Sequence, residues 1–151
     1  MYNVAIIGAG PAGIFAALEI TKLKPDWKVV LIEKGQRIEK RKCPLREGST
    51  KCVNCKRCGL LCGWGGAGAF SDGKLTLTPD VGGHLVDYMT RKQAEDLIGY
   101  ADKLYLDYGA TDEVFGTDMQ VFEEIAHKAV LAELKLVHSP VRHLGTERSL
   151  D

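Results

Sequence analysis

The fold of this chain follows from two stretches, Val4-Ala5-Ile6-Ile7-Gly8-Ala9-Gly10-Pro11-Ala12-Gly13 and, further on, Val29-Val30-Leu31-Ile32-Glu33. In the first, a short apolar run meets a Gly-x-Gly-x-x-Gly turn, and a stretch of helical composition follows. In the second, another apolar run ends in an acid. The order strand, glycine turn, helix, strand and acid is that of a βαβ unit which binds a dinucleotide. We therefore expect an α/β fold.

Each glycine of the turn has its own physical role in such a unit. Gly8 allows the chain to turn sharply out of the strand, and Gly10 lets backbone N–H groups approach a pyrophosphate. Gly13 lets the helix pack closely on the strand. Pro11 suits the first helical position, where a missing N–H costs nothing, and with Ala12 it opens a helix N-terminus that attracts phosphate. These features predict a Rossmann-like βαβ domain.

Glu33 indicates which part of a cofactor would bind beside the second strand. It follows Gly13 by about twenty residues, the separation at which a carboxylate accepts hydrogen bonds from a ribose diol. Such an acid suits FAD or NAD and disfavours the 2′-phosphate of NADP. The simpler alternative is a buried βαβ unit whose glycines only make a turn. That alternative gives no reason for an acid at the end of an apolar run.

The chain resembles the FAD-binding flavoprotein oxidoreductases in its opening motif and in Glu33-Lys34-Gly35. A narrower resemblance lies in Gly63-Trp64-Gly65-Gly66-Ala67-Gly68-Ala69-Phe70-Ser71-Asp72-Gly73-Lys74. This segment is similar to the flavin side of a bacterial group of FAD-dependent dehydrogenases, in which a short cysteine cluster is expected just before it. The resemblance implies FAD as the cofactor, with Lys34 among the residues that bind it, and NAD(P)H as an electron donor in the intact enzyme.

The physical character of the second glycine segment is consistent with this resemblance. Its glycines remove side chains from a stretch that could lie against a flat ring or a pyrophosphate. Its last residues then offer hydrogen-bond donors, an acceptor and a positive charge. A flexible glycine loop is the simpler alternative. The candidate cofactor-binding residues of this segment are Gly65, Gly66, Ala67, Gly68, Ser71, Asp72 and Lys74.

The cysteines form a second pattern, Cys52-x-x-Cys55-x-x-Cys58-x-x-x-Cys62, with Cys43 upstream as a fifth thiol. This is the spacing of a bacterial ferredoxin cluster run, although Cys62 is followed by glycine where that run has proline. A metal site could use Cys43 with the first three thiols of the run, or the four thiols of the run itself. An iron–sulfur cluster, a zinc ion and a redox dithiol are all open. An odd number of cysteines without an export signal disfavours a disulfide framework.

The other elements are predicted from hydrophobic periodicity and turn residues. Leu97, Ala101, Leu104 and Tyr108 make one apolar helical stripe, Gly109 ends that helix, and Asp118 caps the next one. The charged run over 36–42 is interpreted as a solvated helix face, with contact of Arg37, Lys40 and Arg41 to phosphate as the alternative. The expected elements are strands over 2–7, 28–33 and 75–78, helices over 11–23, 84–108 and 119–134, and a strand or extended segment over 136–138 that Pro140 limits.

Composition narrows the class of protein. The 20 basic and 20 acidic residues balance, so charge gives no reason to expect nucleic acid or an anionic membrane as a partner. No stretch reaches the length of about 18 apolar residues that a membrane helix needs, and no signal peptide opens the chain. We therefore expect a cytoplasmic protein that acts on a small molecule. The four histidines have no ligand spacing and are interpreted as structural.

The resemblance also implies a later strand, a Gly-Asp motif for the ribityl chain, and a substrate domain. None of these is recognisable before Asp151. We expect residues 1–151 to be the N-terminal part of an incomplete FAD-binding domain, with a cysteine-rich insertion at about 43–62 and sheet edges that favour self-association. No residue is assigned as a catalytic acid or base. The rival interpretations are an NAD-binding dehydrogenase module and a non-catalytic fragment stapled by zinc.

Overall fold

The computed structural model describes residues 1–145 of the 151-residue chain, and these form two compact units. The first unit spans Met1–Asp72, and the second begins at Gly73. The first contains β1 (Val4–Ile7), α1 (Pro11–Leu23) and β2 (Val29–Ile32). The second contains β3 (Lys74–Thr76), α2 (Arg91–Asp107), α3 (Met119–Leu131) and β4 (Val141–His143).

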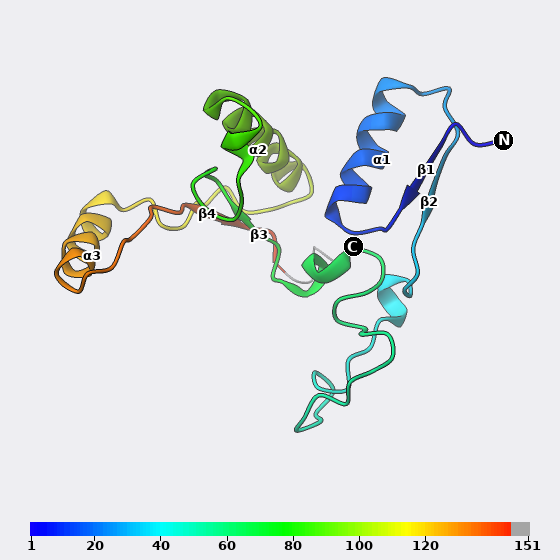
Figure 1. The fold of residues 1–151 in the computed structure, drawn as a ribbon, viewed down its shortest axis with the longest axis horizontal. Coiled ribbons are helices and arrows are strands. Elements are labelled where there is room, and N and C mark those ends of the chain that lie inside the picture. The colour runs from blue at the N-terminus through cyan, green and yellow to red at the C-terminus, as the bar shows by residue number, and fades with distance from the viewer. Residues whose placement is uncertain (146–151) are drawn as a thin grey trace. The chain divides into compact units, whose positions relative to one another are not determined.

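The predicted βαβ unit is present in the first unit. Strands β1 and β2 pair in parallel, with Val4 opposite Val29 and Ile7 opposite Ile32. Helix α1 packs on both strands and lies along them in Figure 1. The bounds of α1 are those predicted. Strand β1 begins later than predicted, and β2 is shorter than predicted at both ends. The mixed helix and strand content agrees with the expected α/β class.

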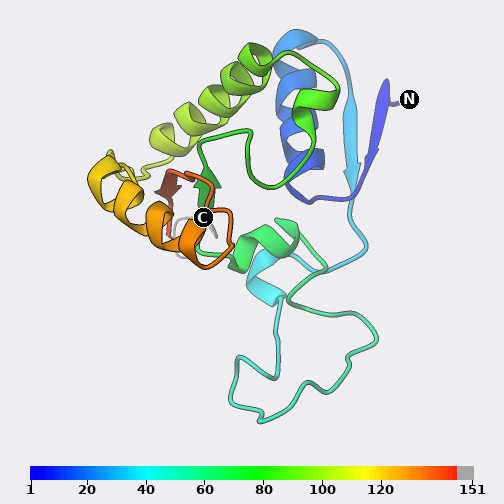
Figure 2. The ribbon, with the colours of Figure 1, turned by 60° about the vertical axis from the view of Figure 1, so that its left-hand side comes forward.

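A long loop leaves the first unit after β2 and returns to it. Figure 2 shows the segment between residues 41 and 62 as one open excursion that starts and ends beside two short helical turns. These are the 3₁₀ turns Ile38–Lys40 and Gly66–Phe70. The prediction of a solvated helix face over 36–42 is wrong at Arg41, whose side chain points inward and is only 7% exposed. The Arg41 guanidinium donates hydrogen bonds to backbone carbonyls of the returning loop.

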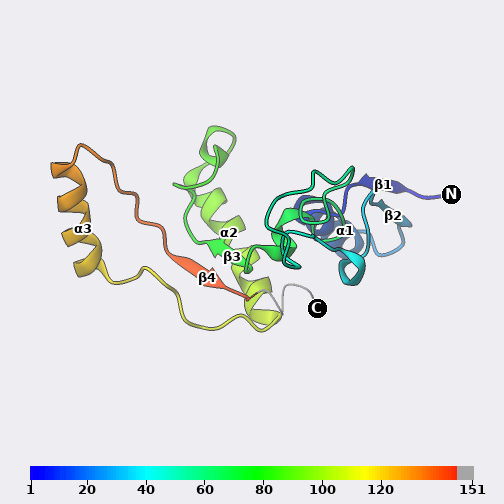
Figure 3. The ribbon, with the colours of Figure 1, turned by 90° about the horizontal axis from the view of Figure 1, so that it is seen from below.

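The second unit is built on an antiparallel pair of strands. β3 pairs with β4, so that Lys74 lies opposite His143 and Thr76 opposite Val141. The buried Arg142 of β4 donates to both carboxylate oxygens of Asp102 on α2. This ion pair fixes the strand pair to the helix. Figure 3 shows extended segments that join α3 to the rest of this unit.

The position of β4 corrects the sequence prediction. No strand forms over 136–138, and the strand follows Pro140 instead of ending before it. The register of the two strands puts Leu77 opposite Pro140, and Pro140 has no N–H with which to donate back to Leu77, so the strand begins only after it. The Pro140 carbonyl accepts a hydrogen bond from the N–H of Leu77 at 2.8 Å, which extends the β3–β4 pairing by one bond.

Helix α2 begins later than predicted, and its predicted apolar stripe is only partly buried. Thr90 and Gln93 form a reciprocal capping box that fixes the helix start at Arg91. Ala94 is fully buried, whereas Leu97 is 52% exposed. Ala94 lies on the same helical face as the predicted stripe, of which Ala101 and Leu104 are half-buried and Leu97 and Tyr108 are exposed.

Helix α3 begins as predicted. The carboxylate of Asp118 accepts a hydrogen bond from the N–H of Val121 at 3.1 Å, which confirms the predicted cap. The helix ends at Leu131, three residues earlier than predicted. Within residues 1–145, no helix combines the length and the apolar character that crossing a membrane requires.

Candidate functional site

The first glycine turn has the close packing that its sequence predicts. Gly8 has a φ of +100°, a conformation that residues with side chains rarely adopt. A Cβ placed on Gly13 would lie 2.0 Å from the carbonyl oxygen of Gly8, so only glycine fits between helix and turn. A Cβ on Gly10 would meet no atom of the described residues within 4 Å. The turn is thus tight on its inner side and open beside Gly10.

The start of α1 offers backbone donors at this open side. Gly10 is the N-cap, and no side chain of the described part of the chain caps the helix. The first helical bond runs from the N–H of Ile14 to the carbonyl of Gly10 at 3.0 Å. The N–H groups of Ala12 and Gly13 precede this bond, in the position of the free donors of a helix N-terminus. Such donors, together with the helix dipole, favour an anion.

Glu33 lies at the same turn, joined to it by hydrogen bonds. One carboxylate oxygen accepts from the N–H of Ala9 at 2.8 Å, and the other accepts from the N–H of Gly35 at 2.7 Å. The bond from Ala9, followed by that from Gly35, lowers the pKa of Glu33 below its ordinary value. The group is therefore ionised at neutral pH. A carboxylate has about four acceptor positions, so two bonds leave capacity for a hydroxyl donor.

The second glycine segment packs directly on the first turn. The N–H of Gly65 donates to the carbonyl of Ala9 at 2.8 Å, and Ala9 is fully buried between the two. A Cβ on Gly66 would lie 3.1 Å from the Cα of Gly10 and 3.4 Å from the Cδ of Pro11. Gly65 and Gly66 both have positive φ, at 80° and 61°, which explains why glycine occupies these positions. The structure therefore brings the two predicted glycine segments together.

The remaining predicted cofactor residues of this segment are divided between the two units. Ala67 is exposed, and the hydroxyl of Ser71 donates to the carbonyl of Gly68 at 2.7 Å. Asp72 has a positive φ of 67° and ends the first unit. Lys74 belongs to the second unit, where it begins β3.

Lys34, another predicted cofactor residue, takes part through its backbone. Its carbonyl accepts a hydrogen bond from Arg57 of the long loop at 2.9 Å, while its side chain is exposed. The loop is therefore anchored next to Glu33. Neither the motif nor the spacing of the sequence pointed to Arg57.

The five cysteines are not assembled into a metal centre. Cys52 and Cys55 are exposed, the other three are half-buried, and all five are free thiols. Among the residues that the structure describes, no three His, Cys, Asp or Glu side chains are placed to hold a metal ion. The residues in their present arrangement therefore do not fit a zinc ion or an iron–sulfur cluster. Metal binding at Cys43, Cys52, Cys55, Cys58 and Cys62 remains a prediction of their spacing.

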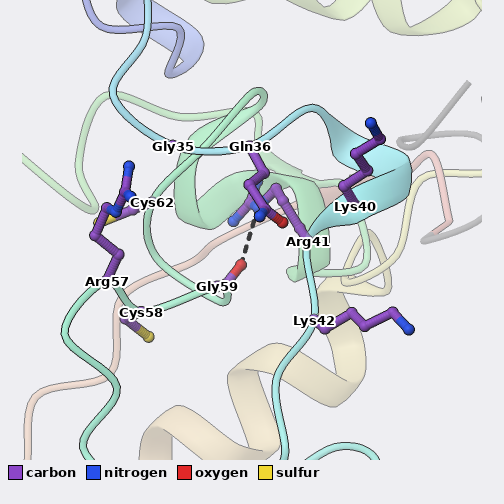
Figure 4. A pocket seen from close by; sticks show the side chains of 9 residues that line it. All are labelled: Gly35, Gln36, Lys40, Arg41, Lys42, Arg57, Cys58, Gly59 and Cys62. Atoms are coloured by element: carbon purple, nitrogen blue, oxygen red, sulfur yellow. Dashed lines mark hydrogen bonds between the residues drawn. The ribbon is translucent and has the colours of Figure 1, made fainter.

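Two of the cysteines line a hollow of about 350 Å³ beside the glycine segments. Cys58 and Cys62 share its wall with Arg41, Arg57 and a short stretch after Glu33, and Figure 4 shows the residues that line it. In this view Arg41 points to the carbonyl of Gly59, whereas Lys40 points away from it. The sequence did not predict that Arg41 is buried against backbone carbonyls, because nothing in the spacing sets it apart from the exposed charged residues beside it.

With this geometry in place, comparison with known proteins identifies the first unit. Residues 3–54 match the family model described as the FAD binding domain. The match confirms the resemblance to FAD-dependent oxidoreductases that the opening motif indicated. The narrower likeness to bacterial FAD-dependent dehydrogenases rests on residues 63–74, which lie outside the matched part of the FAD-binding domain.

The chain is also similar, over most of its length, to a longer protein. A protein of Clostridium beijerinckii, called an uncharacterized protein, is 32% identical to this chain over 122 residues. These residues make up 80% of this chain and 22% of that protein, so the chain spans about a fifth of the length of the curated relative it matches. No solved structure matches the chain.

Proposed function

We propose that the first unit binds FAD as part of an FAD-dependent oxidoreductase. The diphosphate would lie over Gly10 at the start of α1, and Glu33 would accept hydrogen bonds from the adenosine ribose. The segment from Gly65 to Asp72 would contact the diphosphate or the flavin side. The observation that carries this proposal is the bond from the Gly65 N–H to the Ala9 carbonyl, which places both glycine segments at one turn.

Each part of the proposed site has a defined physical task. The helix N-terminus supplies donors and a positive dipole end for the phosphates, and Gly10 leaves the space that their approach needs. The ionised Glu33 supplies a fixed acceptor for hydroxyl groups. When bound, FAD supplies the acceptor for a hydride or an electron pair, and the protein orients it. No described residue is assigned as an acid or a base of the reaction.

The choice of FAD over NAD rests on the second glycine segment and the family match. Glu33 suits the adenosine ribose of either cofactor, so it does not separate them. A nicotinamide-binding module needs no second glycine segment against its phosphate turn, whereas here the N–H of Gly65 bonds to the carbonyl of Ala9 and a Cβ on Gly66 would lie 3.1 Å from the Cα of Gly10. The match of residues 3–54 to the FAD binding domain supports the same choice.

Equilibrium titration of the purified chain tests this proposal. Quenching of flavin fluorescence by the protein, together with competition by ADP, is expected for FAD. FMN, which lacks the adenosine half, is expected to bind at least tenfold more weakly, and NADP should be the weakest dinucleotide because Glu33 opposes its 2′-phosphate. Tighter binding of NAD than of FAD would contradict the proposal and support a nicotinamide-binding module.

Metal binding by the cysteine run is a separate and weaker proposal that rests on spacing alone. Lys51, Lys56 and Arg57 surround the thiols with positive charge, which favours thiolate ligands. Metal analysis and an absorption spectrum of protein purified without oxygen test it. Stoichiometric iron with sulfide-to-iron absorption would support a cluster, stoichiometric zinc a structural site, and metal-free protein with reactive thiols would contradict both.

A further inference from the structure

Arg41 has an environment that charged surface residues do not have. Its side chain is 7% exposed, and it donates three hydrogen bonds to backbone carbonyls. The acceptors are the carbonyls of Gly59 at 2.9 Å, Leu60 at 2.7 Å and Trp64 at 2.5 Å. The guanidinium also lies 4.6 Å from the ring centre of Phe70. All of these contacts are made to the segment that returns from the cysteine-rich loop.

The contact set requires the shape of arginine. Three carbonyls on different residues accept from Nε, Nη1 and Nη2, which a planar guanidinium presents in a fixed fork. A lysine ammonium carries the same charge at one point and cannot reach all three in the same directions. Backbone fits closely around the side chain, since a Cβ on Gly63 would lie 2.7 Å from the Cδ of Arg41.

The segment that Arg41 holds is the one that bears on the phosphate turn. Trp64, one of the acceptors, donates its N–H to the carbonyl of Gln36, which follows β2, at 3.1 Å. The next residue, Gly65, donates its N–H to the carbonyl of Ala9 in the first glycine turn at 2.8 Å. Arg41 therefore holds the carbonyl of Trp64, and the next residue, Gly65, makes the bond that joins the two glycine segments. Burial lowers the pKa of Arg41, and the nearby charges of Cys62, Glu33 and Cys58 oppose that effect.

We propose that Arg41 is a positioning residue for the dinucleotide, one that sets the second glycine segment against the phosphate turn without contacting the ligand. This inference rests on the proposed FAD function. It assigns Arg41 to the flavin side of the site, because its bonds fix Gly59–Trp64 and not the β1–α1–β2 unit that holds the adenosine. Loss of Arg41 would therefore weaken FAD more than ADP.

Amide hydrogen exchange in the unliganded protein tests the structural half of the inference. Arg41→Gln is expected to lose at least tenfold protection at Trp64 and Gly65, while the amides of β1, α1 and β2 keep theirs. Arg46→Gln is the matched control, because the Arg46 guanidinium lies over the same Phe70 ring at 4.9 Å. Unchanged protection at Trp64 and Gly65, or an equal loss in Arg46→Gln, would overturn the inference.

Ligand affinity tests the functional half. Arg41→Gln is expected to weaken FAD at least tenfold and ADP less than threefold, with Arg41→Lys between the wild type and Arg41→Gln. Equal weakening of both ligands would show a merely structural role, and unchanged affinity for both would overturn the inference as well. If Arg41→Gln does not fold, Arg41→Lys carries the same comparison. A wild type that binds no FAD refutes the proposed function, and hydrogen exchange then decides the inference about Arg41 by itself.

Discussion

Within residues 1–145 each unit buries one arginine, and of the two only Arg142 pairs with a carboxylate. Arg142 also donates to the backbone carbonyl of Thr111 at 2.7 Å. Arg41 and Arg142 are both 7% exposed. Arg142 meets the carboxylate of Asp102, and that bond raises its pKa. Arg41 meets three backbone carbonyls, and burial lowers its pKa. A buried arginine thus forms an ion pair in the second unit, whereas in the first unit it holds a loop by hydrogen bonds to backbone carbonyls.

The difference shows how each unit is held together. In the second unit a charge pair joins a strand to a helix, so its stability depends on a countercharge. In the first unit, the βαβ core is closed by backbone packing at Gly13, and Arg41 only arranges a loop on it. The loop of the first unit can therefore change without loss of the βαβ core. This is the organisation expected where a loop completes a ligand site on a rigid scaffold.

The largest effect is expected from Asp102→Ala. This change leaves the buried Arg142 without its carboxylate, and removing one partner of a buried pair typically costs about 3–5 kcal/mol. Urea unfolding followed by hydrogen exchange at α2 and β4 measures it. Asp96→Ala, which breaks the exposed pair with Lys92 on the same helix, is the control and should change little. Equal losses in the two variants would contradict the stabilising role given to the buried Arg142–Asp102 pair.

Gly13→Ala should have the next largest effect, confined to the first unit. The new Cβ would lie 2.0 Å from the carbonyl oxygen of Gly8, so helix and turn must separate, at a cost of about 1–3 kcal/mol. Gly99→Ala makes the same change on α2, where a Cβ meets no described atom within 4 Å. There it should stabilise the protein by about 0.5–1 kcal/mol. Thermal unfolding of both variants checks the opposite signs, and two changes of the same sign would contradict the packing described for Gly13.

The smallest effect is a pH dependence in the first unit. Bonds from Ala9 and Gly35 hold the pKa of Glu33 below its ordinary 4.5 in the folded protein. Since the unfolded chain then binds the proton more tightly, Glu33 stabilises the fold above 4.5 and loses this effect as pH falls through the folded pKa. The stability difference between wild type and Glu33→Gln should therefore shrink on acidification from neutral pH. A difference that stays constant with pH would contradict this.

The local features of the first unit were predictable from sequence, and its long-range contacts were not. Helix α1 begins and ends where Pro11 and Pro25-Asp26 indicate, because helix ends follow local rules. The spacing of Gly8, Gly10 and Gly13 likewise predicts a tight turn. In the structure, the packing at Gly13 leaves no room for a Cβ, as that spacing implies. The bond between Gly65 and Ala9 joins residues far apart in the chain, so no local pattern records it.

The errors have the same origin. Strand β4 forms after Pro140 because it pairs with β3, a partner far away in sequence that no nearby turn announces. Arg41 is buried because carbonyls of the returning loop accept its donors, whereas its neighbours in sequence are solvated. Charge alone predicts a surface position for such a residue. Hydrophobic periodicity therefore could not predict the burial of the arginine in either unit.

The central claim is that the turn at Gly10 holds the diphosphate of FAD, and one substitution tests it most directly. Gly10 has an extended backbone, with φ −79° and ψ 179°, and a Cβ there meets no described atom within 4 Å, so Gly10→Val should keep the fold. Its side chain would occupy the space that the diphosphate needs. Gly99→Val, equally open on α2, is the matched control. In equilibrium titrations with FAD, we predict binding by the wild type and Gly99→Val and at least a hundredfold loss in a folded Gly10→Val. Equal FAD affinity in all three proteins would contradict the claim.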